Sequence, residues 1–122
     1  MTSGKTQIWH NPRCSKSRTA KAALDEAGVE YTERRYLDDP PTAAELRTVL
    51  DQLGLQPWDI TRTSEAEAKE LGMSGWSRTP ADRDQWIDTL VATPKLIQRP
   101  IVVTPDGRAA VARDERSLKS VL

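Results

Sequence analysis

The only cysteine and the only histidine among 122 residues lie four positions apart in the segment IWHNPRCSKSRT, residues 8–19. A thiol is a poor nucleophile until it ionises, and nearby cations or a helix N-terminus lower its pKa from about 8.5 into the range of roughly 3.5 to 7.5. Arg13, Lys16 and Arg18 supply cations around Cys14. The pattern therefore predicts a thiolate that can attack a tetrahedral oxyanion or a disulfide.

The alternative is that Cys14 only packs, because cysteine is among the most buried residue types. A packing cysteine gains nothing from the preceding Asn11, Pro12 and Arg13, so we favour a reactive thiol in a loop. His10 could orient this loop or tune the thiol, although a lone histidine at the end of a strand is at least as often structural. We therefore expect His10 to support the site.

The spacing around Cys14 separates the kinds of cysteine chemistry. A protein phosphatase loop needs an arginine six positions after the cysteine, where Ala20 stands, and a dithiol oxidoreductase needs a second cysteine where Ser17 stands. A resolving thiol must therefore come from another molecule, and Ser17 is placed to hydrogen-bond the sulfur. With one cysteine and one histidine we expect no intramolecular disulfide and no metal site.

Composition limits the remaining classes of function. The chain has 18 Lys and Arg against 18 Asp and Glu, so no net charge attracts it to nucleic acid or to an anionic membrane. No apolar run approaches the roughly 18 residues of a membrane helix, and the N-terminus MTSGKTQIWH has no apolar signal-peptide core. We expect a soluble, cytoplasmic protein with neither nucleic acid nor membrane as a partner.

The first predicted elements place the cysteine between a strand and a helix. TQIWH predicts a strand, NPR predicts a turn, and the apolar spacing from Ala20 to Ala27 predicts a helix that ends at Gly28. Cys14 then lies at the start of this helix. VEYTERRY predicts a second strand, parallel to the first because a helix connects the two.

The middle of the chain predicts helices. Thr42 and Glu45 predict a capping box before a clean apolar stripe, SEAEAKEL predicts a helix that ends at Gly72, and Pro80 predicts the first position of another helix. PWDITR, which begins at Pro57, predicts a short turn between the first two of these helices.

The last third predicts a hairpin and a short helix. RPIVVTPDGRAAVAR predicts two strands around Asp106 and Gly107, with a loop longer than two residues because of Pro105, and Asp114 can cap a final helix. The order βαβ, helices, ββα is that of an α/β, thioredoxin-like fold with a small mixed sheet. We expect residues 1–122 to form a single domain with a helical insertion at about 41–93.

Four segments in this order resemble the ArsC family of glutaredoxin-coupled arsenate reductases: IWHNPRCSKSRTA, YLDDPPTAAEL, ITRTSEAEAKELGM and TPKLIQRPIVVTPDG. The resemblance extends over nearly the whole chain. It implies that the cysteine thiolate attacks arsenate held by the loop and by arginines, with no bound cofactor. Glutathione or another low-molecular-weight thiol then attacks the adduct as co-substrate. Glutaredoxin or a similar redoxin reduces the mixed disulfide, and arsenite leaves.

The resemblance assigns roles residue by residue. Cys14 matches the nucleophile, Arg62 in ITRT matches the mid-chain arginine, and Arg99 matches the arginine before the last hairpin, so these are the expected catalytic residues. Pro100 would be the cis proline that faces the nucleophile, which puts Arg99 beside Cys14. The residues expected to bind the substrate or support the site are His10, Asn11, Arg13, Ser15, Ser17, Pro100 and Arg113.

The third arginine departs from the family pattern. The family places it five residues beyond the hairpin glycine and before a proline, whereas Ala112 holds that spacing here and Arg113 follows it, before Asp114. A slip of one residue turns a side chain to the opposite face of a strand unless the hairpin or a bulge absorbs it. Arg113 is therefore the third arginine only if the end of the strand is irregular.

Two other functions stay open on the sequence. One is a glutathione-dependent thiol or disulfide reductase of unknown substrate, for which arsenate would be incidental. The other is a transcriptional regulator similar to Spx, which binds RNA polymerase and usually senses redox state through a Cys-x-x-Cys pair. Ser17 in place of the second cysteine argues against such a switch. An oxidoreductase that reduces arsenate through Cys14 is the expectation that the residues and the resemblance favour together.

Overall fold

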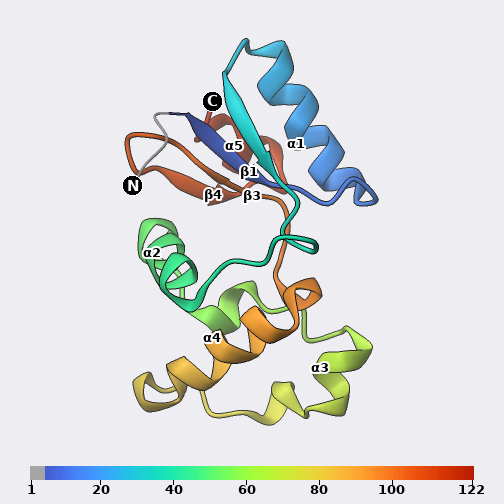
Figure 1. Cartoon of the computed structure of the whole chain (residues 1–122), viewed down its shortest axis with the longest axis vertical. Coiled ribbons are helices and arrows are strands. Elements are labelled where there is room, and N and C mark those ends of the chain that lie inside the picture. Colours follow the sequence, from blue (N-terminus) through green and yellow to red (C-terminus); the bar gives the residue numbers. More distant parts are fainter. Residues whose placement is uncertain (1–4) are drawn as a thin grey trace. The chain divides into compact units, whose positions relative to one another are not determined.

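The computed structural model describes residues 5–122. The chain divides into two compact units, one formed by the described residues up to Asp39 together with Arg99–Leu122, the other by Pro40–Gln98. The first unit holds the sheet and the second is helical (Figure 1). The predicted helical insertion at about 41–93 lies within the second unit, and a single domain for the whole chain stays a prediction.

A four-stranded mixed sheet forms the centre of the first unit. Strand β1 (Thr6–Trp9) pairs in parallel with β2 (Tyr31–Arg34) and antiparallel with β3 (Ile101–Val103), and β3 pairs antiparallel with β4 (Ala109–Val111). The order across the sheet is β2-β1-β3-β4. This arrangement confirms the predicted βαβ unit and terminal hairpin, and with them the mixed α/β fold.

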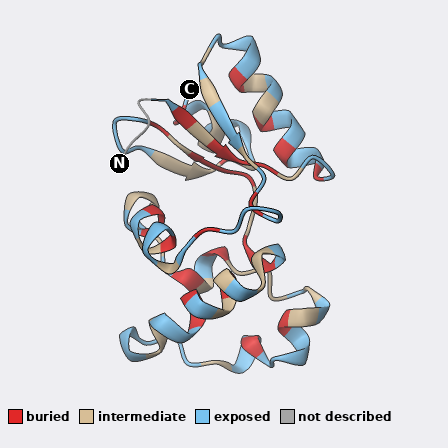
Figure 2. Cartoon of the chain, in the orientation of Figure 1, coloured by how far each residue is buried: buried red, intermediate tan, exposed pale blue. Residues whose placement is uncertain are grey.

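Two helices complete the sheet unit. Helix α1 (Ser15–Glu26) connects β1 to β2, and α5 (Glu115–Lys119) follows β4. Buried positions run along β1, β3 and one side of α1 (Figure 2). Burial of a large aliphatic side chain stabilises a fold by roughly 1.5–3 kcal/mol, so the shared core fixes the start of α1 beside the ends of the strands. The buried members of this core are Ile8, Ala20, Leu24, Val102, Ala112 and Val121.

Strand β2 is shorter than the sequence predicts. The expected strand covers residues 29–36, but the amides of Asp38 and Asp39 both bond to the carbonyl of Arg35, at 3.0 and 2.9 Å, and this turn ends the pairing at Arg34. At the other end, Gly28 adopts a φ of 72° and reverses the chain after α1, as predicted.

The helical unit contains α2 (Ala43–Leu53), α3 (Ala66–Glu70) and α4 (Arg83–Ala92). Within residues 5–122, no helix is both long and apolar enough to cross a membrane. Short 3-10 turns connect and flank these helices at Pro57–Ile60, Met73–Gly75, Pro80–Asp82 and Pro94–Leu96.

The start of α4 differs from prediction. Pro80 opens a 3-10 turn rather than the first turn of α4, and the Thr79 hydroxyl closes that turn with a 2.6 Å hydrogen bond to Asp82.

The packing centre of the helical unit is Trp86, which is fully buried and makes edge contacts with two other indole rings, Trp58 at 6.0 Å and Trp76 at 5.3 Å between ring centroids.

The start of α2 provides a test of local stability. The Thr42 hydroxyl accepts from the Glu45 amide at 3.1 Å and the Glu45 carboxylate accepts from the Thr42 amide at 3.0 Å, which is the predicted capping box. Thr42→Ala should lower the free energy of unfolding by about 1 kcal/mol, measured by chemical denaturation. Thr48→Ala, the same change at an exposed position within α2, is the control and should be nearly neutral. Equal midpoints for Thr42→Ala and wild type would contradict the prediction.

Candidate active site

The loop between β1 and α1 is a turn organised by Asn11. Its side-chain oxygen accepts from the Arg13 amide at 3.0 Å, and its carbonyl accepts from the Cys14 amide at 3.0 Å. Asparagine favours such turns because its short side chain can bond to the backbone two residues on. On the outer side, the Arg18 guanidinium donates to the carbonyl of Pro12 at 3.0 Å. These bonds carry the chain from the end of the strand directly to the first turn of α1.

Cys14 is the residue that caps the N-terminus of α1. Its backbone is extended, with φ −96° and ψ 123°, and Ser15 begins the helix. The first amides of a helix have no partner within the helix, and they carry the positive end of its dipole. The thiol of Cys14 therefore lies beside the unpaired N–H groups at the N-terminus of α1. The side chain is more enclosed than a loop position predicts, because Cys14 is only 8% exposed.

The pKa of Cys14 lies below its ordinary value. Burial alone would raise it, but hydrogen bonds from the backbone amides of Ser17 and Lys16, together with the charge and a side-chain hydrogen bond of Arg99, outweigh that effect. Each of these groups favours the thiolate over the thiol. The thiol of Cys14 is thus poised to act as a nucleophile.

Ser17 bonds to the sulfur with a different group from the one that the sequence suggests. Its backbone N–H points to Cys14, whereas its hydroxyl lies 2.6 Å from Nδ1 of His10 and accepts from the Asn11 amide at 3.0 Å. Both His10 and Ser17 are buried, with 3% and 0% exposure. The hydroxyl therefore connects the loop to the histidine instead of contacting the thiolate directly.

Arg99 is the distant residue that the fold brings to the thiol. The Arg99-Pro100 peptide is cis, as the resemblance implies, and it directly precedes β3, the strand beside β1. The Arg99 Nε atom is buried and has no hydrogen-bond partner among residues 5–122. An unpaired guanidinium N–H beside a thiolate is a donor suited to an oxyanion.

Arg113 reaches the same segment through an irregular end of β4. Its amide bonds to the carbonyl of Val111 at 3.0 Å, a tight bend that ends the regular alternation of the strand. Ala112 then fills the core at 3% exposure, and the Arg113 guanidinium returns to donate to the carbonyl of Arg99 at 2.6 Å. Arg113 therefore holds the backbone of the arginine that faces the thiol.

Arg62 belongs to the helical unit, and residues of that unit contact its guanidinium. The group lies 2.5 Å from the Glu65 carboxylate and donates to the carbonyl of Lys95 at 3.1 Å, while the Arg62 amide bonds to the carbonyl of Leu96 at 2.7 Å. These contacts fix the orientation of Arg62 within its own unit. A part for Arg62 in the chemistry at Cys14 stays a prediction, as does one for the exposed Ser15.

The role of Arg99 in ionising the thiol can be measured directly. Arg99→Met removes a positive charge and a donor while keeping most of the side-chain volume, so the pKa of Cys14 should rise and its thiolate fraction at neutral pH should fall. The pH dependence of alkylation by iodoacetamide reports this pKa, since the chain has one cysteine. Arg116→Met, at an exposed position on α5, is the matched control and should leave the profile unchanged. An unaltered profile in Arg99→Met would show that Arg99 does not lower the pKa of Cys14.

The chain is similar in sequence to proteins of a known family. The model of the ArsC family matches residues 9–121. A protein of Streptomyces viridochromogenes called "Uncharacterized protein in glnII region" is 56% identical, covering 95% of this chain and 98% of its own length. An arsenate reductase of Neisseria meningitidis serogroup A is 38% identical over 95% of this chain and 97% of its own.

A solved structure has the same fold. The arsenate reductase of Vibrio cholerae superposes with a TM-score of 0.80 at 37% identity, covering 95% of this chain and 93% of that one. The family match spans nearly all of the sheet unit and the helical unit, including the loop of Cys14 and the cis proline. The chain therefore belongs to the ArsC family.

Proposed function

We propose that this protein is an arsenate reductase whose nucleophile is Cys14. The observation that carries the proposal is the position of this thiol, at the N-terminus of α1 and beside Arg99, with a pKa below the ordinary value. Relatives that bear the name arsenate reductase, at 37–38% identity, support the choice of substrate. Arsenate is a tetrahedral oxyanion, and the site offers it both backbone amides and a guanidinium.

The first chemical step is attack by the Cys14 thiolate on arsenic. A sulfur-arsenic bond forms, and one arsenate oxygen leaves as water after it is protonated. The guanidinium of Arg99 donates to another arsenate oxygen, and Arg113 keeps that arginine in place by donating to its backbone carbonyl. Arg62 is the proposed second cation for the substrate, as the family resemblance implies.

The number of cysteines determines where the second thiol comes from. Reduction of arsenate to arsenite takes two electrons, and oxidation of two thiols to one disulfide releases two. The chain has a single cysteine, so another molecule must supply the second thiol. Glutathione, followed by glutaredoxin or a similar redoxin, is the proposed reductant. Glutathione attacks the adduct, the mixed disulfide is reduced, and arsenite is released.

The test is arsenate-dependent oxidation of NADPH in the presence of glutathione, glutaredoxin and glutathione reductase. Turnover should be lost in Cys14→Ser, because serine is nearly isosteric but is not ionised at neutral pH, and it should also be lost in Arg62→Ala. Arg47→Ala removes a partly exposed arginine of the same unit, which pairs with the Asp84 carboxylate at 3.1 Å, and should retain full turnover.

Two results would contradict the proposal. One is full turnover by Cys14→Ser, which would show that the thiol takes no part in the reaction. The other is the absence of turnover by folded wild-type protein with glutathione and with an alternative thiol and redoxin pair.

One observation favours a second candidate, a glutathione-dependent reductase of disulfides. The Arg113 guanidinium donates to the carbonyl of Arg99, which leaves fewer free donors for a tetrahedral oxyanion than three convergent arginines would. A thiolate is also the nucleophile that attacks a disulfide sulfur in thiol–disulfide exchange. Turnover of a glutathione mixed disulfide without arsenate-dependent turnover would select this function.

A further inference from the structure

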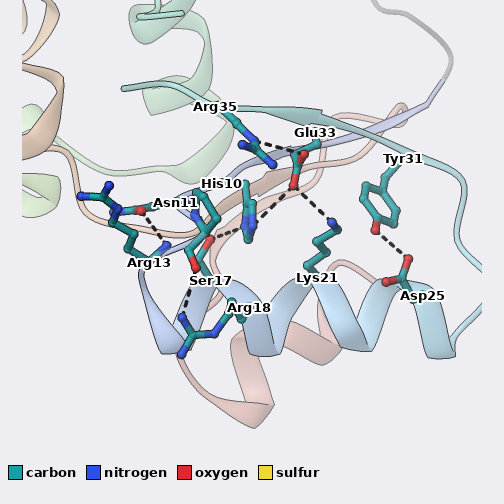
Figure 3. A network of polar contacts seen from close by, with 11 residues as sticks. His10, Asn11, Arg13, Ser17, Arg18, Lys21, Asp25, Tyr31, Glu33 and Arg35 are labelled. Atoms are coloured by element: carbon teal, nitrogen blue, oxygen red, sulfur yellow. Dashed lines mark hydrogen bonds and ion pairs between the residues drawn. The ribbon is translucent and has the colours of Figure 1, made fainter. Parts of the chain in front are cut away.

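Glu33 lies on strand β2 and contacts His10, and its local sequence does not indicate a functional role. Its register partner on β1 is Ile8, and residues two apart on a strand share a face, so Glu33 and His10 lie on the same side of the sheet. The Glu33 Oε1 atom lies 3.4 Å from Nε2 of His10 and 3.3 Å from the Lys21 ammonium (Figure 3). Arg35 contacts the other carboxylate oxygen at 3.4 Å.

The two nitrogens of His10 face partners with different requirements. An ionised carboxylate only accepts hydrogen bonds, so Glu33 favours a proton on Nε2. In a neutral imidazole the other nitrogen, Nδ1, is then an acceptor. The hydroxyl of Ser17 lies 2.6 Å from Nδ1 and already accepts from the Asn11 amide, so its single hydrogen is free to donate to His10.

We propose that Glu33 is a positioning residue: it keeps the proton of neutral His10 on Nε2, and thereby turns the Ser17 hydroxyl hydrogen toward His10 and away from the Cys14 sulfur. The hydrogen bonds then run in one direction, from the Asn11 amide to the Ser17 oxygen and from the Ser17 hydroxyl to His10, whose Nε2 faces the Glu33 carboxylate at 3.4 Å. The sulfur is left to the backbone amides and to Arg99.

The charges around His10 favour the neutral form that this arrangement needs. Burial lowers the pKa of His10 and outweighs the opposite effect of Glu33, and the cations Lys21 and Arg18 on α1 and Arg35 beyond β2 lower it further. Glu33 itself stays ionised, because Lys21 and the other cations around it hold its pKa below the ordinary value despite partial burial. A neutral histidine beside a charged carboxylate is therefore the stable pair near neutral pH.

Ser17 connects the tautomer of His10 to the Cys14 sulfur, because it contacts both residues. Its backbone N–H bonds to the sulfur and its hydroxyl bonds to the histidine. A histidine that carries its proton on Nδ1 would donate to the Ser17 oxygen and release the hydroxyl hydrogen, making it available as an additional donor to the thiolate. The importance of this step for turnover rests on the proposed function, but its tests use no arsenate, so the two can fail independently.

The tautomer can be read by nitrogen-15 NMR, since His10 is the only histidine in the chain. In wild type above the pKa of His10, Nδ1 should give an unprotonated-type resonance and Nε2 a protonated-type resonance. Glu33→Gln keeps the side-chain shape but removes the charge, so the two resonances should move toward each other as both tautomers become populated. Glu30→Gln, the same change at an exposed site three residues earlier, should keep the wild-type pattern. A protonated Nδ1 in wild type, or an unchanged spectrum in folded Glu33→Gln, would overturn the proposal.

A second measurement separates the route through Ser17 from a direct effect of charge. Ultraviolet titration of the thiolate should give a lower pKa of Cys14 in Glu33→Gln than in wild type. In a Ser17→Ala background the same Glu33→Gln change should produce no further lowering, because the hydroxyl that transmits it is gone. An equal lowering in both backgrounds would show that the Glu33 charge acts through space and would overturn the part assigned to Ser17.

Discussion

A buried thiol whose pKa is lowered at the N-terminus of α1 is the constraint on which the rest of the sheet unit depends. Burial destabilises a thiolate, and Cys14 is only 8% exposed, so neighbouring groups must stabilise the ionised form. The amides of Ser17 and Lys16 provide part of the compensation and Arg99 provides the rest. The helix must therefore begin at Ser15, and the segment before β3 must pass close to the loop.

Two sets of contacts hold this arrangement, one from each side of β1. On the β2 side, Glu33, His10 and Ser17 connect the neighbouring strand to the first turn of α1. On the β3 side, Arg113 bonds to the carbonyl of Arg99 and fixes the backbone before the cis proline. Both sets use side chains to secure backbone or buried polar groups, which restricts the loop to one geometry.

The sequence predicts the parts of the site that are local and misses those that depend on strand register. Cys14 at a helix start, the end of α1 at Gly28, the capping box at Thr42 and the N-cap at Asp114 follow from neighbouring residues, and the structure confirms each of them. The partner of His10 does not follow in this way. Glu33 faces it only because β1 and β2 pair in parallel with Ile8 opposite Glu33, a long-range fact that the pattern of VEYTERRY does not contain.

The path of Arg113 can be predicted only in part. The sequence shows that the spacing after Gly107 is one residue longer than in the family pattern and requires an irregular strand end, but the bend at Val111 and the bond to the carbonyl of Arg99 appear only in the structure. The spacing of one helical turn predicts a bond from the Ser17 hydroxyl to the sulfur, but in the structure this hydroxyl lies 2.6 Å from Nδ1 of buried His10. In contrast, the ion pair of Arg62 with Glu65 joins residues three apart, a spacing that sequence reasoning can examine.

The measurement that tests the central claim most directly is the ultraviolet titration of the wild-type thiolate. The chain has one cysteine, so the thiolate absorbance reports on Cys14 alone. The midpoint should lie below about 8.5, the ordinary value of a cysteine thiol. A midpoint at or above that value would show that burial outweighs the amides and Arg99, and that Cys14 is not the activated nucleophile described above.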